Sequence, residues 1–207
     1  ACGSETINFT VVIGEAPSFT LSNETVCSGV ATNIGISTSS NTTYLWSPST
    51  GLSNATVSNP ILTAGSAAET TSITYTLTAT NTGSACSSSE QMNVLVVNPV
   101  VNAGPDVTFC SEDTVQIGSP DATDYVYSWT PSKGVVSPNK SLTNVTINNP
   151  SNTTVVQVYT LEAKYLGCVS YDDVTLNTKA LPRINLPKDT AICSLDSIVL
   201  NHNGNIS

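Results

Sequence analysis

Thr, Ser, Asn and Val dominate this 207-residue sequence, and only 10% of its residues are charged. The formal net charge of −9 disfavours nucleic acid and anionic lipid as partners, because like charges repel. No apolar stretch approaches the roughly 18 residues needed to cross a bilayer, so we expect no direct membrane insertion. The six cysteines indicate an oxidising compartment, and we expect an extracellular protein of the cell surface.

An internal repeat organises the chain. The intervals between Cys27, Cys110 and Cys193 are equal, since 110 − 27 = 83 and 193 − 110 = 83, and a serine follows each cysteine. Trp46 and Trp129 keep the same interval, 129 − 46 = 83. The pattern Tyr-x-Trp-Ser/Thr-Pro-Ser-x-Gly around both tryptophans repeats as well. The chain is therefore predicted to be a tandem array of one module of about 83 residues.

Each module shows the period-two alternation of strands with one buried face. Apolar residues alternate with threonine from Ile73 to Ala79, and a matching run follows Tyr159. Further strands are expected at 19–21, 32–36, 43–46, 61–63 and 92–97. Roughly seven short strands per module predict an all-β fold of tandem immunoglobulin-like sandwiches, with Trp46 and Trp129 in the core. The alternative role of these tryptophans is an exposed platform that stacks on sugar rings.

Two further repeated series set the predicted module boundaries. One series of cysteines recurs at steps of 84 and 82, and one of prolines at 82 and 83: Cys2, Cys86 and Cys168; Pro17, Pro99 and Pro182. We place linkers at the prolines. This predicts the C-terminal tail of a preceding module at 1–15, complete modules at 16–98 and 99–181, and the start of a following module at 182–207.

Repetition leaves two schemes open for the disulfides. The simpler one joins Cys27 to Cys86 and Cys110 to Cys168, and leaves Cys2 and Cys193 to pair with residues outside this sequence. The other scheme joins chain neighbours across each boundary, as Cys2–Cys27, Cys86–Cys110 and Cys168–Cys193. Either scheme removes unfolded-state entropy on the order of 4 kcal/mol per bond.

Candidate catalytic and metal-binding residues are few. A Ser-His-Asp or Cys-His site would need His202, which lies in an incomplete module and is not repeated, so we expect neither an enzyme nor a cofactor. Four acidic residues on two loops have the oxygen ligands that Ca²⁺ prefers, but solvated loops are the main interpretation, because the first module has Ser and Asn there. These weak candidates are Asp121, Asp124, Asp172 and Asp173.

Three triplets of Asp, then Ser or Thr, then an apolar residue resemble the O-glycosylation acceptor of Bacteroidota. They mark Thr114, Thr190 and Ser197 as candidate glycan sites. The pattern is short, and it also arises by chance in Thr-rich sequence.

Several segments together resemble one class of repeat. The stretch 103–111, the Tyr-x-Trp turn, the Tyr-Thr-Leu strands at 75–77 and 159–161, and Gly167-Cys168 are similar to the PKD-like or immunoglobulin-like repeats of giant Bacteroidota cell-surface proteins. Such repeats occur in adhesins, gliding-motility proteins and secreted hydrolases. The chain departs from PKD proper in lacking the run Trp-Asp-Phe-Gly-Asp-Gly. The resemblance implies type IX secretion, with surface attachment by a domain outside this sequence.

Uniform repetition favours a structural function, because a spacer needs length and no unique site. We expect the stalk of a large secreted bacterial adhesin, which holds a distal binding region away from the cell and has neighbouring modules of its own chain as partners. One alternative is a module that binds surface polysaccharide or another surface protein through Tyr125, Tyr165 and Tyr171. Further alternatives are an accessory region of a secreted multidomain hydrolase and a filament subunit that associates through strand edges.

Overall fold

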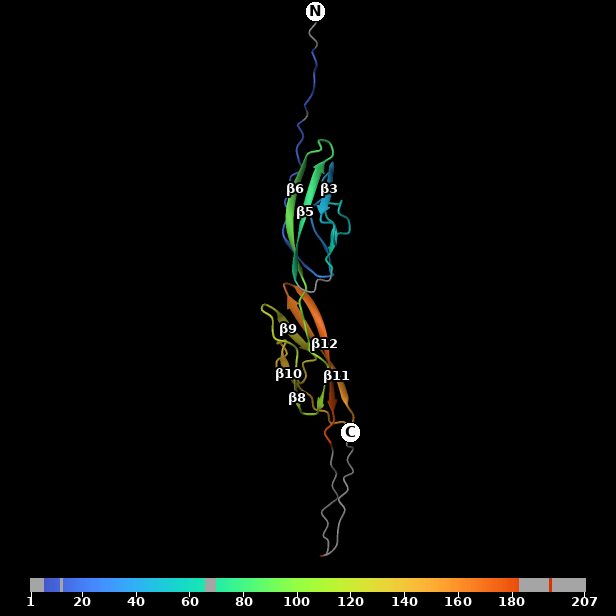
Figure 1. Cartoon of the computed structure of the whole chain (residues 1–207), viewed down its shortest axis with the longest axis vertical. Coiled ribbons are helices and arrows are strands. Elements are labelled where there is room, and N and C mark those ends of the chain that lie inside the picture. Colours follow the sequence, from blue (N-terminus) through green and yellow to red (C-terminus); the bar gives the residue numbers. More distant parts are fainter. Residues whose placement is uncertain (1–5, 12, 66–69, 183–193, 195–207) are drawn as a thin grey trace, which may run out of the picture. The chain divides into compact units, whose positions relative to one another are not determined.

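The computed structural model describes residues 6–11, 13–65, 70–182 and 194. The described residues form twelve strands and no helix, so none of their elements is a helix able to span a membrane. They divide into two compact units (Figure 1), and each unit combines two stretches of chain. The first unit lies within 1–100 and 164–170, and the second within 101–163 and 171–207.

The first unit consists of a four-stranded and a two-stranded sheet. The larger sheet has the order β1-β6-β5-β3, and the smaller one pairs β2 with β4. β1 runs parallel to β6, whereas the other pairs are antiparallel. The strands are β1 (Glu24–Cys27), β2 (Ala31–Asn33), β3 (Thr42–Ser47), β4 (Ile61–Thr63), β5 (Thr71–Asn81) and β6 (Ser87–Val97).

The second unit repeats this topology strand for strand. Its larger sheet has the order β7-β12-β11-β9, with β7 parallel to β12, and its smaller sheet pairs β8 with β10. The strands are β7 (Val107–Cys110), β8 (Thr114–Ile117), β9 (Val126–Thr130), β10 (Thr143–Thr146), β11 (Val155–Tyr165) and β12 (Cys168–Lys179). Two sheets around one core, with a buried tryptophan on the third strand, form an immunoglobulin-like sandwich. The predicted all-β tandem fold is confirmed.

The cores follow from the alternation in the sequence. Side chains of a strand point to opposite faces in turn, so β5 buries Tyr75, Leu77 and Ala79 while its threonines face outward. β11 buries Tyr159, Leu161 and Ala163 in the same way. Trp46 meets the ring of Tyr75 edge-on, with 6.4 Å between the ring centroids.

Some predicted elements differ from the observed ones. The strand predicted at 61–63 is β4, whereas the stretch predicted at 19–21 forms no strand. Phe19 and Leu21 instead pack as partly buried residues against the first core. The module boundary predicted at 98/99 stays a prediction. The division into units falls between Val100 and Val101 and assigns 164–170, the tip of the β11–β12 hairpin, to the first unit.

Candidate functional site

A disulfide between Cys27 and Cys168 is the most distinctive chemical feature of the described chain. It joins the last residue of β1 to the first residue of β12, with 5.4 Å between the Cα atoms and a sequence separation of 141 residues. The bond lies within the first unit, because the hairpin tip 164–170 belongs to that unit. Cys86 and Cys110 are free thiols.

This bond corrects the predicted pairing of Cys27 with Cys86 and of Cys110 with Cys168. Cys27 lies opposite Val97 in the parallel β1–β6 pair, and Cys86 lies just before the other end of β6, since 97 − 86 = 11. At about 3.3 Å per residue this distance is roughly 36 Å, whereas a disulfide needs Cα atoms about 4.4–6.8 Å apart. In the second repeat Cys110 lies opposite Lys179, and the interval to Cys168 at the far end of β12 is the same, 179 − 168 = 11.

The backbone around Cys110 matches that around Cys27. The amide of the serine after each cysteine donates to the carbonyl of the register partner: Ser28 N to Val97 O at 2.9 Å, and Ser111 N to Lys179 O at 2.8 Å. Each cysteine carbonyl also accepts from the amide three residues on, from Val30 N at 3.1 Å and from Asp113 N at 3.2 Å. The same strand end therefore presents a bonded cysteine in one unit and an exposed thiol in the other.

Cys86 and Cys168 also occupy corresponding places, directly after the turn of the long hairpin. Cys168 follows Leu166 and Gly167, whose φ angles of 47° and 83° fit a tight two-residue turn with both residues left-handed. The β5–β6 turn is longer, and Asn81 stabilises it by accepting from Gly83 N at 2.8 Å and donating its own N–H to Cys86 O at 2.9 Å.

Both tryptophans lie inside the sandwiches. Trp46 and Trp129 are 2% and 3% exposed, and each indole N–H donates to a backbone carbonyl at 2.9 Å, to Val57 O and Lys140 O respectively. These carbonyls are themselves one period apart, since 140 − 57 = 83. The burial of both rings leaves no exposed aromatic platform at these positions.

A glycine stands against each indole. Gly35 and Gly118 have φ angles of 105° and 86°, which L side chains rarely adopt. A Cβ atom at Gly118 would also collide with the carbonyl oxygen of Ser141 and lie 3.2 Å from the Trp129 ring. Only glycine therefore fits this position.

Two buried tyrosines close the cores at the start of the long hairpins. The hydroxyl of Tyr75 donates to Thr50 O and that of Tyr159 to Lys133 O, each at 2.7 Å. Burial raises the pKa of both tyrosines above the usual 10.0, because the anion would lose its hydration.

The four calcium candidates have different environments. Asp121 receives Lys140 Nζ at 2.9 Å and Ser141 N at 2.7 Å, and the hydrogen bond from Lys140 holds the pKa of this carboxyl below 3.8. Asp172 accepts from Ala103 N at 2.8 Å, while Asp124 and Asp173 are exposed. Among the residues that the structure describes, no three His, Cys, Asp or Glu side chains gather as a metal site.

The other candidates are placed separately. Thr114 is exposed at the start of β8, and its Oγ1 lies 2.9 Å from Thr146 Oγ1. Tyr125 is half-buried and stacks on Tyr127 with 5.8 Å between ring centroids, whereas Tyr165 is half-buried at the end of β11 and Tyr171 is exposed on β12. Five further candidates lie outside the described residues: Cys2, Thr190, Cys193, Ser197 and His202.

Comparisons with known proteins give low similarities. No family model and no curated protein matches the chain. Among solved structures, a SusE-like surface located polysaccharide binding protein from the Bacteroides thetaiotaomicron heparin utilisation locus has a TM-score of 0.38 at 10% identity, over 80% of this chain and 34% of its own. An I-band fragment of titin gives 0.36 at 14%, over 79% and 65%, and Drosophila N-cadherin gives 0.36 at 14%, over 77% and 48%.

The chain thus spans about a third of the length of that Bacteroides protein. At these identities and TM-scores the likenesses carry no argument about binding partners. The immunoglobulin-like assignment follows from the strand order and the buried tryptophans described above.

Proposed function

We propose that this chain is a structural stalk segment of a secreted bacterial cell-surface adhesin, a spacer that carries tension between a distal binding region and the cell. The observation that supports this function is the disulfide between Cys27 and Cys168. Its place in the chain determines which segments stretch when the two ends are pulled apart.

The disulfide provides a short covalent path through the chain. A pull from both ends loads the segment up to Cys27, crosses the sulfur–sulfur bond to Cys168, and leaves along β12. Residues 28–167, which contain most strands of both sandwiches, form a closed loop outside this path. β12 is itself an extended strand, so this part of the loaded path has little length left to give.

The loop outside the path is large. Its ends are 141 positions apart in the sequence, and it would extend by about 490 Å if it unfolded, at roughly 3.5 Å per residue, but the bond holds the two cysteines at a Cα distance of 5.4 Å. In the chain-entropy model, closing this loop removes about 5 kcal/mol of unfolded-state entropy. A spacer under tension benefits from both effects, since its modules neither lengthen nor unfold readily.

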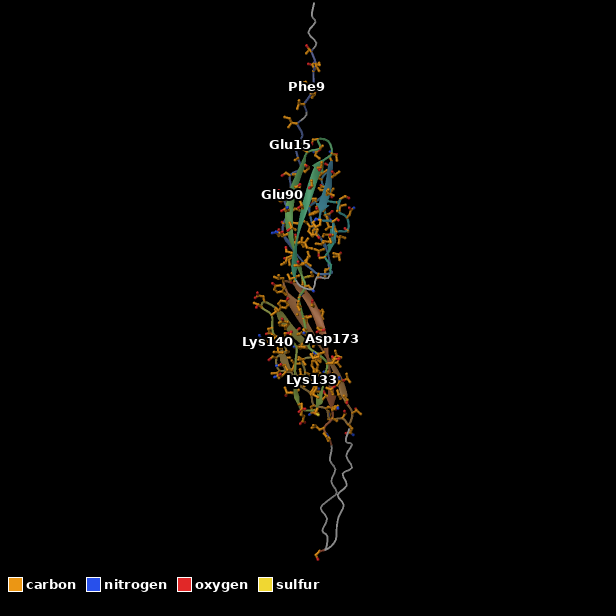
Figure 2. All side chains as sticks on the ribbon, viewed as in Figure 1. Phe9, Glu15, Glu90, Lys133, Lys140 and Asp173 are labelled. Atoms are coloured by element: carbon orange, nitrogen blue, oxygen red, sulfur yellow. A yellow bond between two sulfur atoms is a disulfide. The ribbon has the colours of Figure 1, made fainter. Side chains whose placement is uncertain are left out.

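The segment that precedes Gly14 supports the idea of further modules in the array. Ile7, Phe9, Val11 and Ile13 alternate along this segment and are 71–89% exposed, and Figure 2 shows Phe9 on the extended stretch that precedes β1. The corresponding run in β6, from Met92 to Val96, buries its alternate residues to 2% or less. This exposure supports the proposal that the segment belongs to the last strand of a preceding sandwich.

A polysaccharide-binding module is the second candidate function, and the described surface gives it less support than the stalk function. One shallow depression of about 260 Å³ lies on the first unit, and no aromatic ring lines it for stacking on a sugar. Its lining residues are Glu24, Asn33, Ile34, Gly35, Ile36, Ser37 and Asn59. Secretion by the type IX route and a role in gliding rest on the repeat resemblance alone.

Single-molecule stretching between the two chain ends tests the function. The oxidised chain is expected to show no unfolding step from residues 28–167, whereas the double variant Cys27→Ser/Cys168→Ser releases about 490 Å more contour length. The matched control is Cys86→Ser/Cys110→Ser, which keeps the bond and should stretch like the parent chain. Equal extension of the oxidised parent and the Cys27→Ser/Cys168→Ser variant would refute a tension-bearing role for the bond.

A further inference from the structure

We propose that Cys86 and Cys110 each form a further disulfide of this kind, with a cysteine of another repeat. In this arrangement Cys110 pairs with the hairpin cysteine of one neighbouring repeat, and Cys86 pairs with the strand-end cysteine of another. The inference goes beyond the stalk function, because it assigns partners to two thiols that this function does not use.

Cys110 is presented as Cys27 is presented. Both end the first strand of their sheet in a parallel pair, and the same two backbone hydrogen bonds hold the turn that follows. Cys27 in this setting binds a hairpin cysteine one repeat further along the chain. Cys110 is exposed in the identical setting, so its thiol is available to a hairpin cysteine that approaches from outside the described chain.

The surroundings of Cys86 indicate independently what binds there. The Cys86 thiol lies 3.4 Å from the carbonyl oxygen of Gly14. Gly14 lies one period before Val97, since 97 − 83 = 14, and Val97 is the register partner of Cys27. By this correspondence, the strand-end cysteine of a preceding repeat would lie beside Gly14. The Cys86 thiol is next to that same residue.

Two further contacts hold the β5–β6 hairpin against residues 14–17, the lead-in segment that precedes β1. Ser88 donates a hydrogen bond from its hydroxyl to Pro17 O. Gly14 lies so close to Ser84 that a Cβ atom at position 14 would collide with the serine side chain. The lead-in segment thus lies against the hairpin at Cys86. If the first strand of a preceding repeat pairs beside Gly14, as β1 pairs beside Val97, the cysteine at the end of that strand comes close to Cys86.

Formation of the bond needs an oxidant, and a low-molecular-weight disulfide such as oxidised glutathione supplies it. The thiolate of Cys110 attacks one glutathione sulfur and releases a glutathione thiolate. The thiolate of a partner's hairpin cysteine then attacks the mixed disulfide at the Cys110 sulfur and releases the second. Two protein thiols are oxidised and one glutathione disulfide is reduced to two thiols, so atoms and electrons balance.

Two complementary variants of this chain test the pairing, with one copy acting as the neighbouring repeat of the other. Both carry Cys2→Ser and Cys193→Ser and keep the Cys27–Cys168 bond. One adds Cys86→Ser and keeps only the Cys110 thiol, and the other adds Cys110→Ser and keeps only the Cys86 thiol. They are mixed in a glutathione redox buffer, with one variant isotopically heavy, and the dimers are separated on a non-reducing gel.

We expect the mixed dimer in roughly tenfold excess over either homodimer, with a Cys110–Cys86 linked peptide in its digest. A statistical mixture of the three dimers, a predominance of homodimers or an absence of dimers would each overturn the proposal. Matching thermal unfolding curves of the two variants show that both are folded. The stretching experiment on the Cys27–Cys168 bond does not depend on this result, so the two proposals can fail separately.

Discussion

The first and second repeats bury the same residue types in their cores, but they use their cysteines differently. Tryptophan, the glycine against it and the tyrosine that closes the core recur with the same hydrogen bonds. The strand-end cysteine is bonded in the first repeat and free in the second, and for the hairpin cysteine the reverse holds. Each repeat therefore completes its core with its own residues, whereas the disulfide uses one cysteine of each repeat.

A second difference lies within the cores. The second repeat buries three polar side chains near the end of its parallel strand pair, namely Ser111, Asn149 and Thr178. Asn149 links them, since its amide group donates to Thr178 O at 2.7 Å and its backbone N–H donates to Ser111 Oγ at 2.8 Å. The first repeat has Val96 where the second has Thr178, so the two cores differ in polarity at this place.

The largest effect should separate the two pairs of cysteines. Cys27→Ser/Cys168→Ser is expected to lower the free energy of unfolding by about 5 kcal/mol, because the loop between these two cysteines, which are 141 positions apart, opens in the unfolded state. Cys86→Ser/Cys110→Ser should change it by less than about 0.5 kcal/mol, since neither thiol is bonded. Urea denaturation under oxidising conditions measures both. Similar losses for the two variants would show that the cysteines are energetically equivalent.

The second test asks whether the two buried tryptophans, which make matching contacts, contribute equally to stability. Trp46→Ala and Trp129→Ala should each cost about 3–5 kcal/mol, because each removes a buried ring and leaves a cavity. Circular dichroism during denaturation follows the altered repeat, and the remaining tryptophan reports on the other repeat by fluorescence. A loss below about 1 kcal/mol in either repeat would contradict a core role for that indole.

The third test exchanges the residues that differ between the cores. Thr178 Oγ1 is buried without a hydrogen-bond partner among the described residues, so Thr178→Val should raise the free energy of unfolding by about 1–3 kcal/mol. The reciprocal change Val96→Thr should lower it by a similar amount. Thermal unfolding measures both variants. A stabilising Val96→Thr or a destabilising Thr178→Val would show that the hydroxyl finds a partner.

The smallest effect concerns one loop in each repeat. Asp121 binds Lys140 and Ser141, whereas Thr38, one period earlier, shares a neutral hydrogen bond with Ser58 at 2.8 Å. Asp121→Asn should cost less than about 1 kcal/mol, because the ion pair is exposed.

The pH dependence of this loop has a defined sign. Because the pKa of Asp121 is lowered on folding, its contribution is present above the ordinary value of 3.8 and is lost as the pH falls through the folded-state pKa. The first repeat, with Thr38, should lack this dependence. Denaturation curves between about pH 2 and 6, with Thr38→Val as the control, check it. An unchanged acid profile in Asp121→Asn would contradict the assignment.

The sequence alone determined the all-β class, the repeat and its period, and the buried faces of the long strands. Those features are local, because the alternation around Tyr75 and the repeated sequence around Trp46 already indicate which side chains face inward. The strand at 24–27 carried no such signal, because it has only four residues and just one of them, Val26, is buried. It forms because its backbone pairs in parallel with β6.

The tertiary structure decided which of the described cysteines are bonded. Cysteine spacing in the sequence favoured pairing within a module, yet in each module a long extended strand, β6 or β12, separates its two cysteines from end to end. The number of residues between the two cysteines is visible in the sequence. The distance between their Cα atoms depends on which strands pair and in what register. A disulfide forms only where two Cα atoms come within several ångströms, and strand pairing between distant parts of the chain sets that distance.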